Sequence, residues 1–293
     1  MPLPYRLHAP GAFPDWVGEG RFVPCHRMSD LADAARHHPT LTFAWQGNRI
    51  LHATEASFPL EDVPADLPVQ RTLPVGLLDG RPCVAVDIAA EAPAPAGHAW
   101  TGLRALFNTL DAGWIALAGR SFQLLEWERT HQFCGRCATP MVMRAHERGR
   151  ECPACQFVAY PRISPVVMGL VVRGRELLLA RSPHFAPGMY SAVAGFVEVG
   201  ESLEQSLARE ILEETGIHAG HFQYFDSQPW PFPHSLMVAF TAEYASGTPV
   251  PQPGEIEDVQ WFAHDRLPVL PPPISIAGRL IRAVASHLAS LDP

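Results

Sequence analysis

The chain has 293 residues, of which 47% are hydrophobic and 18% charged, with 30 prolines and a formal net charge of −8. This length favours two domains, and the composition is that of a soluble protein able to bury a core. The many prolines predict rigid loops and short elements. The negative charge argues against a broad surface for RNA or DNA, because nonspecific affinity for nucleic acids comes largely from Lys and Arg, but it leaves room for a local basic patch.

The two ends of the sequence show no targeting signal. Residues 1–16 have neither an apolar stretch after a charged start nor an amphipathic pattern rich in Arg and Ser, and the C-terminal Leu291-Asp292-Pro293 is not a peroxisomal signal. Every apolar run falls short of the roughly 18 residues that a membrane helix requires. We therefore expect a cytoplasmic protein without a membrane partner.

Residues 1–128 predict an α+β domain to which the sequence assigns no function. Short apolar runs such as Leu41–Trp45 and Cys83–Val86 end in turn residues, as strands do. Apolar residues with helical spacing occur over Asp30–His38 and Leu103–Leu110. No internal repeat is visible in the sequence.

Four cysteines lie close together in the next segment, residues 129–159. They form two C-x2-C pairs separated by fourteen residues, namely Cys134, Cys137, Cys152 and Cys155. Each pair has the spacing of a tetrahedral thiolate site, and two disulfides are the alternative. Because the cytosol keeps thiols reduced, we expect a small module with one structural zinc ion per chain. The other two cysteines, Cys25 and Cys83, are expected to be buried apolar residues.

Residues 160–293 predict a third domain in which strands and helices alternate. Val166–Val172 and Leu177–Ala180 read as a buried hairpin around the turn at Arg173-Gly174. Further strands are expected over Ala192–Val197 and Leu236–Ala242, and a closing helix over Ile276–Leu291.

The clearest helix signal covers Ser202–Thr215. Ser202 and Gln205 form a capping box, and Gly216 supplies a left-handed stop. An apolar stripe along one face consists of Leu203, Leu207 and Ile211. The capping box, the apolar stripe and the glycine stop therefore all predict the same helix.

Three acidic residues crowd one patch of this helix. Glu210, Glu213 and Glu214 are spaced i, i+3 and i+4, so their carboxylates project from one side. They occupy the last turn, where the helix dipole disfavours negative charge. A hard divalent cation would offset both the mutual repulsion of the carboxylates and their unfavourable interaction with the helix dipole. Mg²⁺ takes carboxylate oxygens together with substrate phosphates. A solvated acidic face is the alternative for three such residues taken alone.

The surrounding sequence decides between these interpretations. From Gly195 to Ile217 it fills every fixed position of the pattern G-x5-E-x7-R-E-U-x-E-E-x-G-U, where U is aliphatic. This segment, the Nudix box, resembles that of the Nudix hydrolase superfamily. The resemblance implies an α/β/α sandwich around a mixed sheet, with catalytic metal held against a diphosphate. We expect Arg209 to compensate the charge of the carboxylates.

A second segment resembles one family within this superfamily. Residues 227–235 read SQPWPFPHS, which matches the SQPWPFPxS array of NADH pyrophosphatases, and a four-cysteine zinc module belongs to that family too. The alternating prolines stiffen this segment, so Trp230 and Phe232 can offer flat faces for stacking on a ring. A Pro-aromatic loop packed on the core is the alternative.

The resemblance also implies roles for individual residues. Mg²⁺ or Mn²⁺ is expected on Glu210, Glu213, Glu214 and Glu255, and one of the three box glutamates is expected to act as the base. Contacts with the substrate are expected from Ala194, Phe196, Glu147, Tyr160, Gln228, Trp230, Ser235 and Ala277. Sequence reasoning does not say which glutamate accepts the proton, because a metal ligand and a base look alike in one dimension.

These features lead to one functional hypothesis with several alternatives. We expect hydrolysis of the pyrophosphate bond of NAD(H) to nicotinamide mononucleotide and AMP, and the resemblance also allows removal of NAD caps from RNA 5′ ends. A broad hydrolase of ADP-ribose or dinucleoside polyphosphates is an alternative. A non-catalytic nucleotide sensor is another, and the intact box argues against it. The resemblance further implies a homodimer.

Overall fold

The computed structural model describes residues 19, 21–54, 58–107 and 109–291. They fall into two compact units. The C-terminal unit comprises Ile163–Trp230 and the chain from Ser235 onward, and the N-terminal unit comprises the described residues up to Arg162 together with Pro231–His234. Residues 1–16 and 292–293, on which the expectations about targeting rest, lie outside the described residues. No helix among the described residues is long and apolar enough to cross a bilayer.

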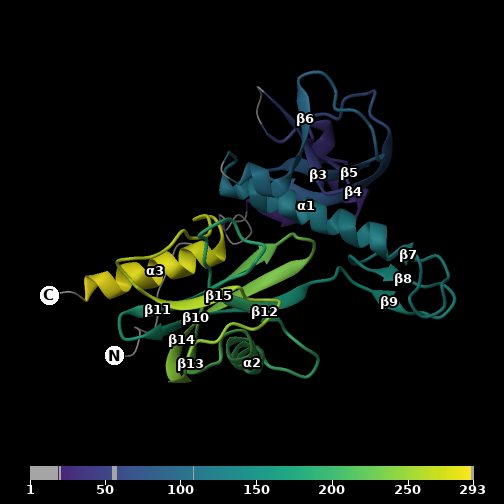
Figure 1. The fold of residues 1–293 in the computed structure, drawn as a ribbon. Coiled ribbons are helices and arrows are strands. Elements are labelled where there is room, and N and C mark those ends of the chain that lie inside the picture. The colour runs from purple at the N-terminus through teal and green to yellow at the C-terminus, as the bar shows by residue number, and fades with distance from the viewer. Residues whose placement is uncertain (1–18, 20, 55–57, 108, 292–293) are drawn as a thin grey trace. The chain divides into compact units, whose positions relative to one another are not determined.

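The C-terminal unit is built on a mixed six-stranded sheet (Figure 1). Five strands follow the order β13-β14-β10-β11-β15, and β12 pairs with β10. Only the β10–β14 pair is parallel. The strands are β10 (Ser164–Arg173), β11 (Glu176–Arg181), β12 (Val193–Phe196), β13 (Ile217–Trp230), β14 (Ser235–Gly247) and β15 (Asp258–Ala263). The expected hairpin is therefore confirmed, whereas β13 and β15 were not foreseen.

Two helices cover opposite faces of this sheet, α2 (Leu203–Thr215) and α3 (Ile276–Ser290). Side chains of β10 alternate between the faces, as strand geometry requires. Val166, Met168, Leu170 and Val172 pack in one cluster with residues of α3, including Leu280 and Ile281. Val167 and Val171 pack in another with Leu207 and Ile211 of α2. The predicted α/β/α sandwich is therefore confirmed.

The N-terminal unit contains a second six-stranded sheet, ordered β1-β4-β5-β2-β3-β6. Its strands are β1 (Phe22–Pro24), β2 (Leu41–Gln46), β3 (Arg49–Ala53), β4 (Val69–Leu78), β5 (Arg81–Ile88) and β6 (His98–Gly102). The two expected helices are replaced by short 3-10 turns, η1 (Met28–Leu31), η2 (Ala34–Arg36) and η3 (Leu103–Leu106). The long helix of this unit is α1 (Ala112–Thr130), which the sequence did not reveal because its apolar residues surround the helix rather than forming one stripe.

The two units share one topology. In each, an antiparallel hairpin (β2–β3 or β10–β11) is followed by a second antiparallel pair (β4–β5 or β13–β14), an edge strand (β6 or β15) and a helix (α1 or α3). The first strand of the hairpin pairs in parallel with the last strand of the second pair, as β2–β5 and as β10–β14. Among the described residues, no element between β3 and β4 corresponds to β12 or α2. The two units therefore share a topology although no internal repeat is visible in the sequence.

The cysteine module carries a small sheet of its own, β7 (Val142–Met143), β8 (Arg150–Glu151) and β9 (Val158–Ala159). It is tied to α1 within the N-terminal unit. Arg150 of β8 forms a buried ion pair with Glu128 of α1, and its guanidinium also donates to the carbonyl of Met141 at 3.2 Å. Each buried charge is thereby paired, and the attraction between the two charges offsets part of the cost of their desolvation.

Candidate active site

The Nudix box folds as the end of β12, a loop and α2. The Ser202 hydroxyl accepts from the Gln205 amide at 3.2 Å, and the Gln205 side chain accepts from the Ser202 amide at 2.8 Å. Gly216 ends the helix with a φ of 70°. The capping box and the glycine stop are therefore confirmed, and they fix the helix that carries the acidic residues.

Glu210 lies directly against the backbone of β12. A Cβ atom added to Gly195 would lie 1.9 Å from Cδ of Glu210 and 2.2 Å from both carboxylate oxygens. Only a glycine leaves room for this approach. The first residue of the box thus allows the carboxylate to lie between α2 and the sheet.

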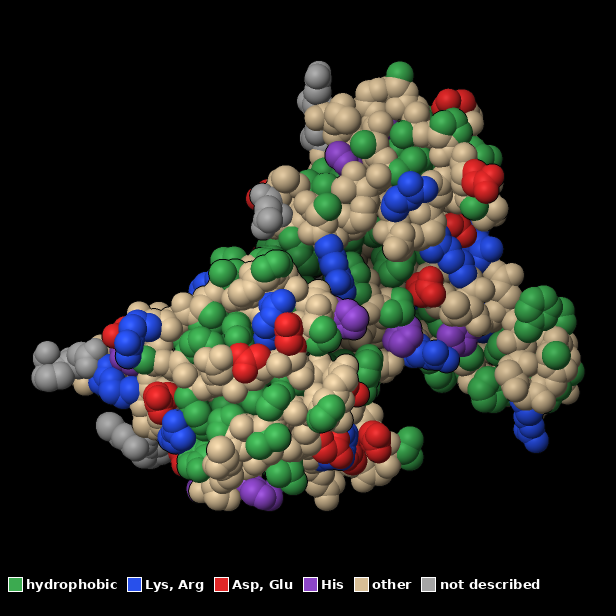
Figure 2. Space-filling model, viewed as in Figure 1, with side chains coloured by type: hydrophobic (Ala, Val, Ile, Leu, Met, Phe, Trp, Pro, Cys, Tyr) green, Lys and Arg blue, Asp and Glu red, His purple; other side chains and the backbone are tan. Residues whose placement is uncertain are grey.

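The carboxylates of α2 form a concentrated negative charge. Glu214 is buried, with 8% of its surface exposed. Burial, followed by the charges of Glu210, Glu255 and Glu213, raises the pKa of Glu214 from 4.5 to about 8. Burial also raises the pKa of Glu210, although Arg209 opposes the shift. In Figure 2 acidic side chains gather beside α2.

Arg209 neutralises part of this charge. Its guanidinium donates to both oxygens of Glu201, at 2.6 and 2.8 Å, and also to Glu210 at 2.7 Å and Glu213 at 3.1 Å. The bond to Arg209, helped by the backbone amide of Glu198, holds the pKa of Glu201 at about 2. Arg209 therefore acts as the predicted charge partner. Glu201, a box residue without an expected role, positions it.

Glu255 reaches the acidic patch through the Pro-rich turn after β14. The Gln252 amide donates to the carbonyl of Glu214 at 3.1 Å, and the Glu255 amide donates to the carbonyl of Gln252 at 3.3 Å. These bonds hold the turn at the C-terminal end of α2. Glu255 is exposed and contributes to the charge that acts on Glu210 and Glu214.

The chemistry of these side chains suits a divalent cation, although among the described residues only the four cysteines form a compact group of metal-ligating atoms. The glutamates offer carboxylate oxygens, which are the ligands that Mg²⁺ and Mn²⁺ prefer. Burial and the charges of three neighbouring carboxylates raise the pKa of Glu214 to about 8, so its ionised form needs additional positive charge. A cation would supply that charge.

The expected substrate contacts in the C-terminal unit differ in exposure. Phe196 is 58% exposed at the end of β12, next to the half-buried Ala194. Trp230 is partly buried against the cluster under α3. Ser235 and Ala277 are buried, with 5% and 6% exposed, so little of either side chain is accessible to a ligand.

Gln228 is used structurally. It is 1% exposed. Its amide nitrogen donates to the carbonyl of Ile274 at 2.9 Å, and its oxygen accepts from the amide of Ile276 at 2.7 Å. These bonds fix the end of β13 to the start of α3. Its expected role as a substrate contact stays a prediction.

The other two expected contacts lie in the N-terminal unit. The Tyr160 hydroxyl donates to Glu147 at 3.1 Å, and Arg144 forms an ion pair with Glu147. Tyr160 is 52% exposed. Tyr160 and Glu147, which were predicted independently as substrate contacts, therefore form a hydrogen-bonded pair.

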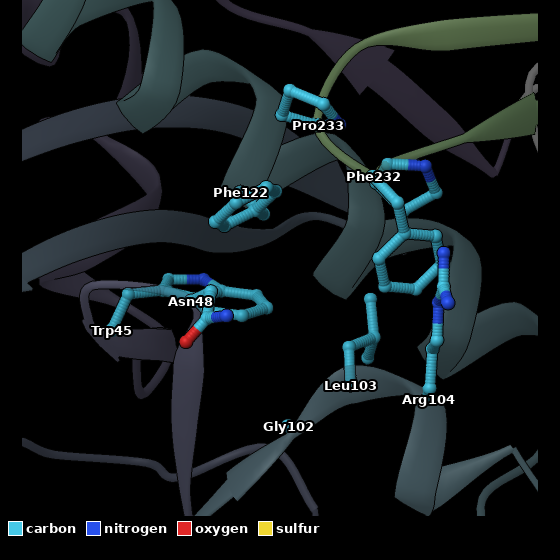
Figure 3. A pocket seen from close by; sticks show the side chains of 9 residues that line it. Trp45, Asn48, Gly102, Leu103, Arg104, Phe122, Phe232 and Pro233 are labelled. Carbon is cyan, nitrogen blue, oxygen red and sulfur yellow. The ribbon is translucent and has the colours of Figure 1, made fainter. Parts of the chain in front are cut away.

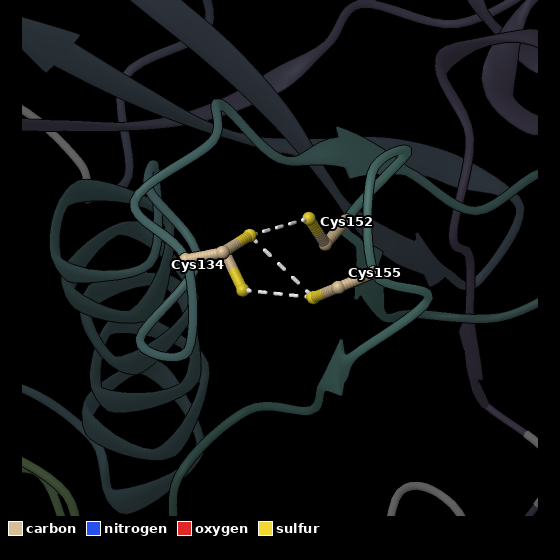
Figure 4. Close-up of side chains that lie close together, drawn as sticks. Cys134, Cys152 and Cys155 are labelled. Atoms are coloured by element: carbon tan, nitrogen blue, oxygen red, sulfur yellow. Dashed lines mark hydrogen bonds between the residues drawn. The ribbon is translucent and has the colours of Figure 1, made fainter.

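The four cysteine sulfurs gather in one cluster (Figure 4). All four lie within 4.8 Å of one another, with close pairs at 3.4, 3.5 and 3.6 Å. Sulfurs of a zinc tetrahedron are about 3.8 Å apart, whereas those of a disulfide are about 2 Å apart. Hydrogen bonds with Thr139 and with the neighbouring thiols lower the pKa of Cys137 to about 6. The geometry is that of a four-thiolate metal site and excludes the alternative of two disulfides.

Comparison with known proteins agrees with this geometry. A NUDIX domain model matches residues 163–283, a model of the NADH pyrophosphatase zinc ribbon domain matches residues 129–158, and a model of the NADH pyrophosphatase-like rudimentary NUDIX domain matches residues 39–127. A protein named NAD-capped RNA hydrolase NudC from Chromobacterium violaceum is 52% identical over 218 residues, covering 74% of this chain and 82% of its own. The chain belongs to the NADH pyrophosphatase family of Nudix hydrolases.

Two further comparisons indicate the extent of the likeness. The NAD-capped RNA hydrolase NudC of Pseudomonas putida strain W619 is 43% identical over 270 residues, which cover 90% of this chain and 98% of that protein. The crystal structure of a NUDIX hydrolase from Nitrosomonas europaea is 23% identical, with a TM-score of 0.44 over 55% of this chain and 92% of that one.

Family membership explains the shared topology of the two units. The rudimentary Nudix domain keeps the sheet and the closing helix and, within its described residues, has no counterpart of α2. The chain thus carries one Nudix domain with a box and one without. Sequence reasoning missed the relationship because strand pairing between distant segments leaves no local signal.

Proposed function

We propose that this Nudix hydrolase cleaves the pyrophosphate bond of NAD(H), giving nicotinamide mononucleotide and AMP. The observation that carries the proposal is the juxtaposition of Glu210, Glu213, Glu214 and Glu255, which is consistent with a cation site. The uninterrupted SQPWPFPHS segment supports a dinucleotide among the substrates of the superfamily.

The four glutamates would hold Mg²⁺ or Mn²⁺. Such ions neutralise charge on phosphate oxygens and activate water for attack on phosphorus. Glu210 lies against Gly195 and pairs with Arg209, and these contacts would position its carboxylate. The buried Glu214 and the exposed Glu213 are both candidates for the proton acceptor, because a bound cation would favour the ionised form of either carboxyl.

Substrate recognition would use faces outside the box. The exposed ring of Phe196 follows the glycine that holds Glu210, which suits it to stack on a base. Trp230 is partly buried against the core, so only part of its side chain would be available to the substrate. Ala194, Ser235 and Ala277 would contact the ligand through backbone atoms or small surfaces. Glu147 and Tyr160 would act as a hydrogen-bonded pair.

The four cysteines would hold one zinc ion with a structural role. A site closed by four thiolates has no open position for a substrate, so this ion would not take part in hydrolysis. We also propose a homodimer, as the resemblance implies, and a location in the cytoplasm, as expected from the sequence.

NAD at the 5′ end of RNA is a second candidate substrate. Several relatives carry the name NAD-capped RNA hydrolase, and one of them is 52% identical. Both substrates contain the same diphosphate. The net charge of −8 disfavours a broad RNA surface and leaves only local contacts.

Product analysis tests the proposal. The protein is incubated with NADH, NAD, ADP-ribose or an NAD-capped oligonucleotide, in the presence of Mg²⁺ or Mn²⁺, and the products are separated by chromatography. Nicotinamide mononucleotide and AMP from NADH are the expected products. Turnover of ADP-ribose at a higher kcat/KM than that of every NAD compound would favour the broad-range alternative.

A further inference from the structure

Two arginines of the N-terminal unit carry positive charge that the fold leaves uncompensated. Arg120 lies on α1, and Arg148 lies in the loop between β7 and β8. Both side chains are half-buried, and the Nε atom of each is buried without a hydrogen-bond partner. Among the described residues, no carboxylate forms an ion pair with either guanidinium.

Both guanidiniums lie beside the edge strand β1 and its neighbour β4. The guanidinium carbon of Arg120 lies 5.4 Å from the centre of the Phe22 ring in β1. Nη2 of Arg148 donates to the carbonyl of Pro74 in β4 at 3.0 Å and also to the carbonyl of Cys25, directly after β1. A ring face and two carbonyls orient the cations, but they supply no net negative charge.

The two cations repel each other. Burial, followed by the charge of Arg120, lowers the pKa of Arg148 to about 10. Burial also lowers the pKa of Arg120. The Cys25 thiol lies near both, but burial raises its pKa, so it stays neutral and offers no counter-charge. Both arginines therefore remain cations at neutral pH.

Other buried charges of the same unit are paired. The carboxylate of Asp87 is buried and forms ion pairs with Arg71, at 3.1 Å, and with Arg129. Arg150 pairs with Glu128. A charge that is removed from water without a counter-charge is strongly unfavourable. Two interacting cations of this kind therefore indicate a site whose negative charge is supplied by a ligand.

A cavity of about 430 Å³ in this unit lacks that property (Figure 3). Trp45 and Phe122 in its wall are 1% and 7% exposed, so their rings offer little open surface. The cation of Arg104 already lies over the ring of Phe232, with 4.2 Å between the guanidinium carbon and the ring centre. The cavity therefore offers no comparable charge to an anion.

We propose that Arg120 and Arg148 together bind a phosphate group, either inorganic phosphate or a small phosphate monoester. A phosphate monoester carries about −1.5 to −2 charges at pH 7, which matches two cations, whereas a carboxylate would neutralise only one. The planar guanidinium offers several donors in an arrangement that suits phosphate oxygens. Both arginines belong to the N-terminal unit, and the site is independent of the proposed hydrolysis.

Isothermal titration calorimetry with inorganic phosphate tests the proposal on the full chain with zinc retained. Magnesium and manganese are removed, so that the glutamates of α2 hold no metal that could attract phosphate. A parallel titration with ribose 5-phosphate measures the binding of a monoester. We expect saturable binding at a single site, and the ligand with the lower Kd identifies the source of the phosphate group.

Arg120→Met removes one charge and keeps an unbranched side chain beside Phe22. The Kd should rise at least about 10-fold, because hydrogen bonds to a charged group are lost. Without ligand, the melting temperature should stay at the native value or rise, because the repulsion with Arg148 is gone. Arg148→Gln should weaken binding as well, and its zinc content checks the fold.

Arg36→Met is the matched control. Arg36 lies in the same unit with 68% of its side chain exposed, so this variant removes the same net charge away from the proposed site. Its Kd should stay at the native value. An equal loss of affinity in Arg36→Met and Arg120→Met would show a response to net charge alone and would overturn the proposal.

Three other results would also overturn it. The first is native protein that binds neither ligand saturably. The second is an equal Kd for native protein and Arg120→Met. The third is a large fall in the melting temperature of Arg120→Met without ligand, which would mean that the fold already uses this charge. Because no substrate is cleaved in these measurements, a failure to hydrolyse NAD(H) would leave them interpretable.

Discussion

Gly195 and Glu210 lie so close that a single methyl group could not be placed between them. The added Cβ would be 1.9 Å from Cδ of the carboxyl. Glu210 also pairs with Arg209 at 2.7 Å, so a shift of its side chain would disturb that ion pair. The glycine of the Nudix box is therefore a spatial requirement of the carboxylate.

Gly195→Ala should displace Glu210 and lower kcat by a factor on the order of 10². The displacement changes the position of one proposed metal ligand, so the concentration of Mg²⁺ needed for half-maximal activity should rise as well. Steady-state kinetics over a magnesium titration measure both quantities. Gly220→Ala, where a Cβ meets open space, is the control. Unchanged kinetics of Gly195→Ala would mean that the reaction does not depend on the position of Glu210.

Stability without divalent cations should depend on Glu214. Its pKa in the folded protein is about 8, above the ordinary 4.5. Between these two pH values the folded state therefore keeps a proton that the unfolded state has lost. The free energy of unfolding should therefore fall as the pH rises from about 4.5 to about 8. Urea unfolding at several pH values, in protein freed of magnesium and manganese with zinc retained, measures this slope.

Glu214→Gln should flatten that slope, because the amide does not titrate. The same variant should lower kcat by a factor on the order of 10² or more if the carboxylate holds metal or accepts the proton. Equal slopes for both proteins would mean that Glu214 ionises normally in the folded state.

The sequence predicted the elements that carry local signals. Ser202, Gln205 and Gly216 mark the ends of α2 through their own side chains and backbone, and the acidic residues are placed by helical spacing alone. Three features carried no such local signal. β13 contains bulges that interrupt its alternation, α1 is apolar on all sides, and both amide atoms of Gln228 are used by the start of α3. No local pattern reveals such partners.

Cys152→Ser should release zinc and destabilise the N-terminal unit. Cys152 is fully buried, and its sulfur lies 3.4 Å from that of Cys137, so the hydroxyl cannot replace the thiolate in the cluster. Metal analysis should find about one zinc per chain in the native protein and much less in the variant. Cys25→Ser, which lies outside the cluster, should retain the metal. A native protein without zinc would contradict the assignment.

Phe196→Ala tests base stacking at the candidate active site more cleanly than Trp230→Ala. Trp230 is packed on the core, so its loss would reduce stability as well as binding. Phe196 is 58% exposed, and its truncation should leave the melting temperature unchanged. Loss of a stacked base weakens binding by about 1 to 3 kcal/mol, or roughly 5- to 150-fold. The increase should appear in KM for NADH, with kcat largely retained.

Tyr224→Ala is the matched control for this variant. Tyr224 is an aromatic residue of the same unit with 60% of its surface exposed, and its ring contacts Phe240 at a centroid distance of 6.0 Å. Truncation there removes a similar exposed ring at a position that we assign no substrate contact, so KM should stay at the native value. If both variants raised KM equally, the effect would reflect general loosening of the sheet. If neither did, Phe196 would not contact the base, and recognition would depend on the residues of β13 and α3.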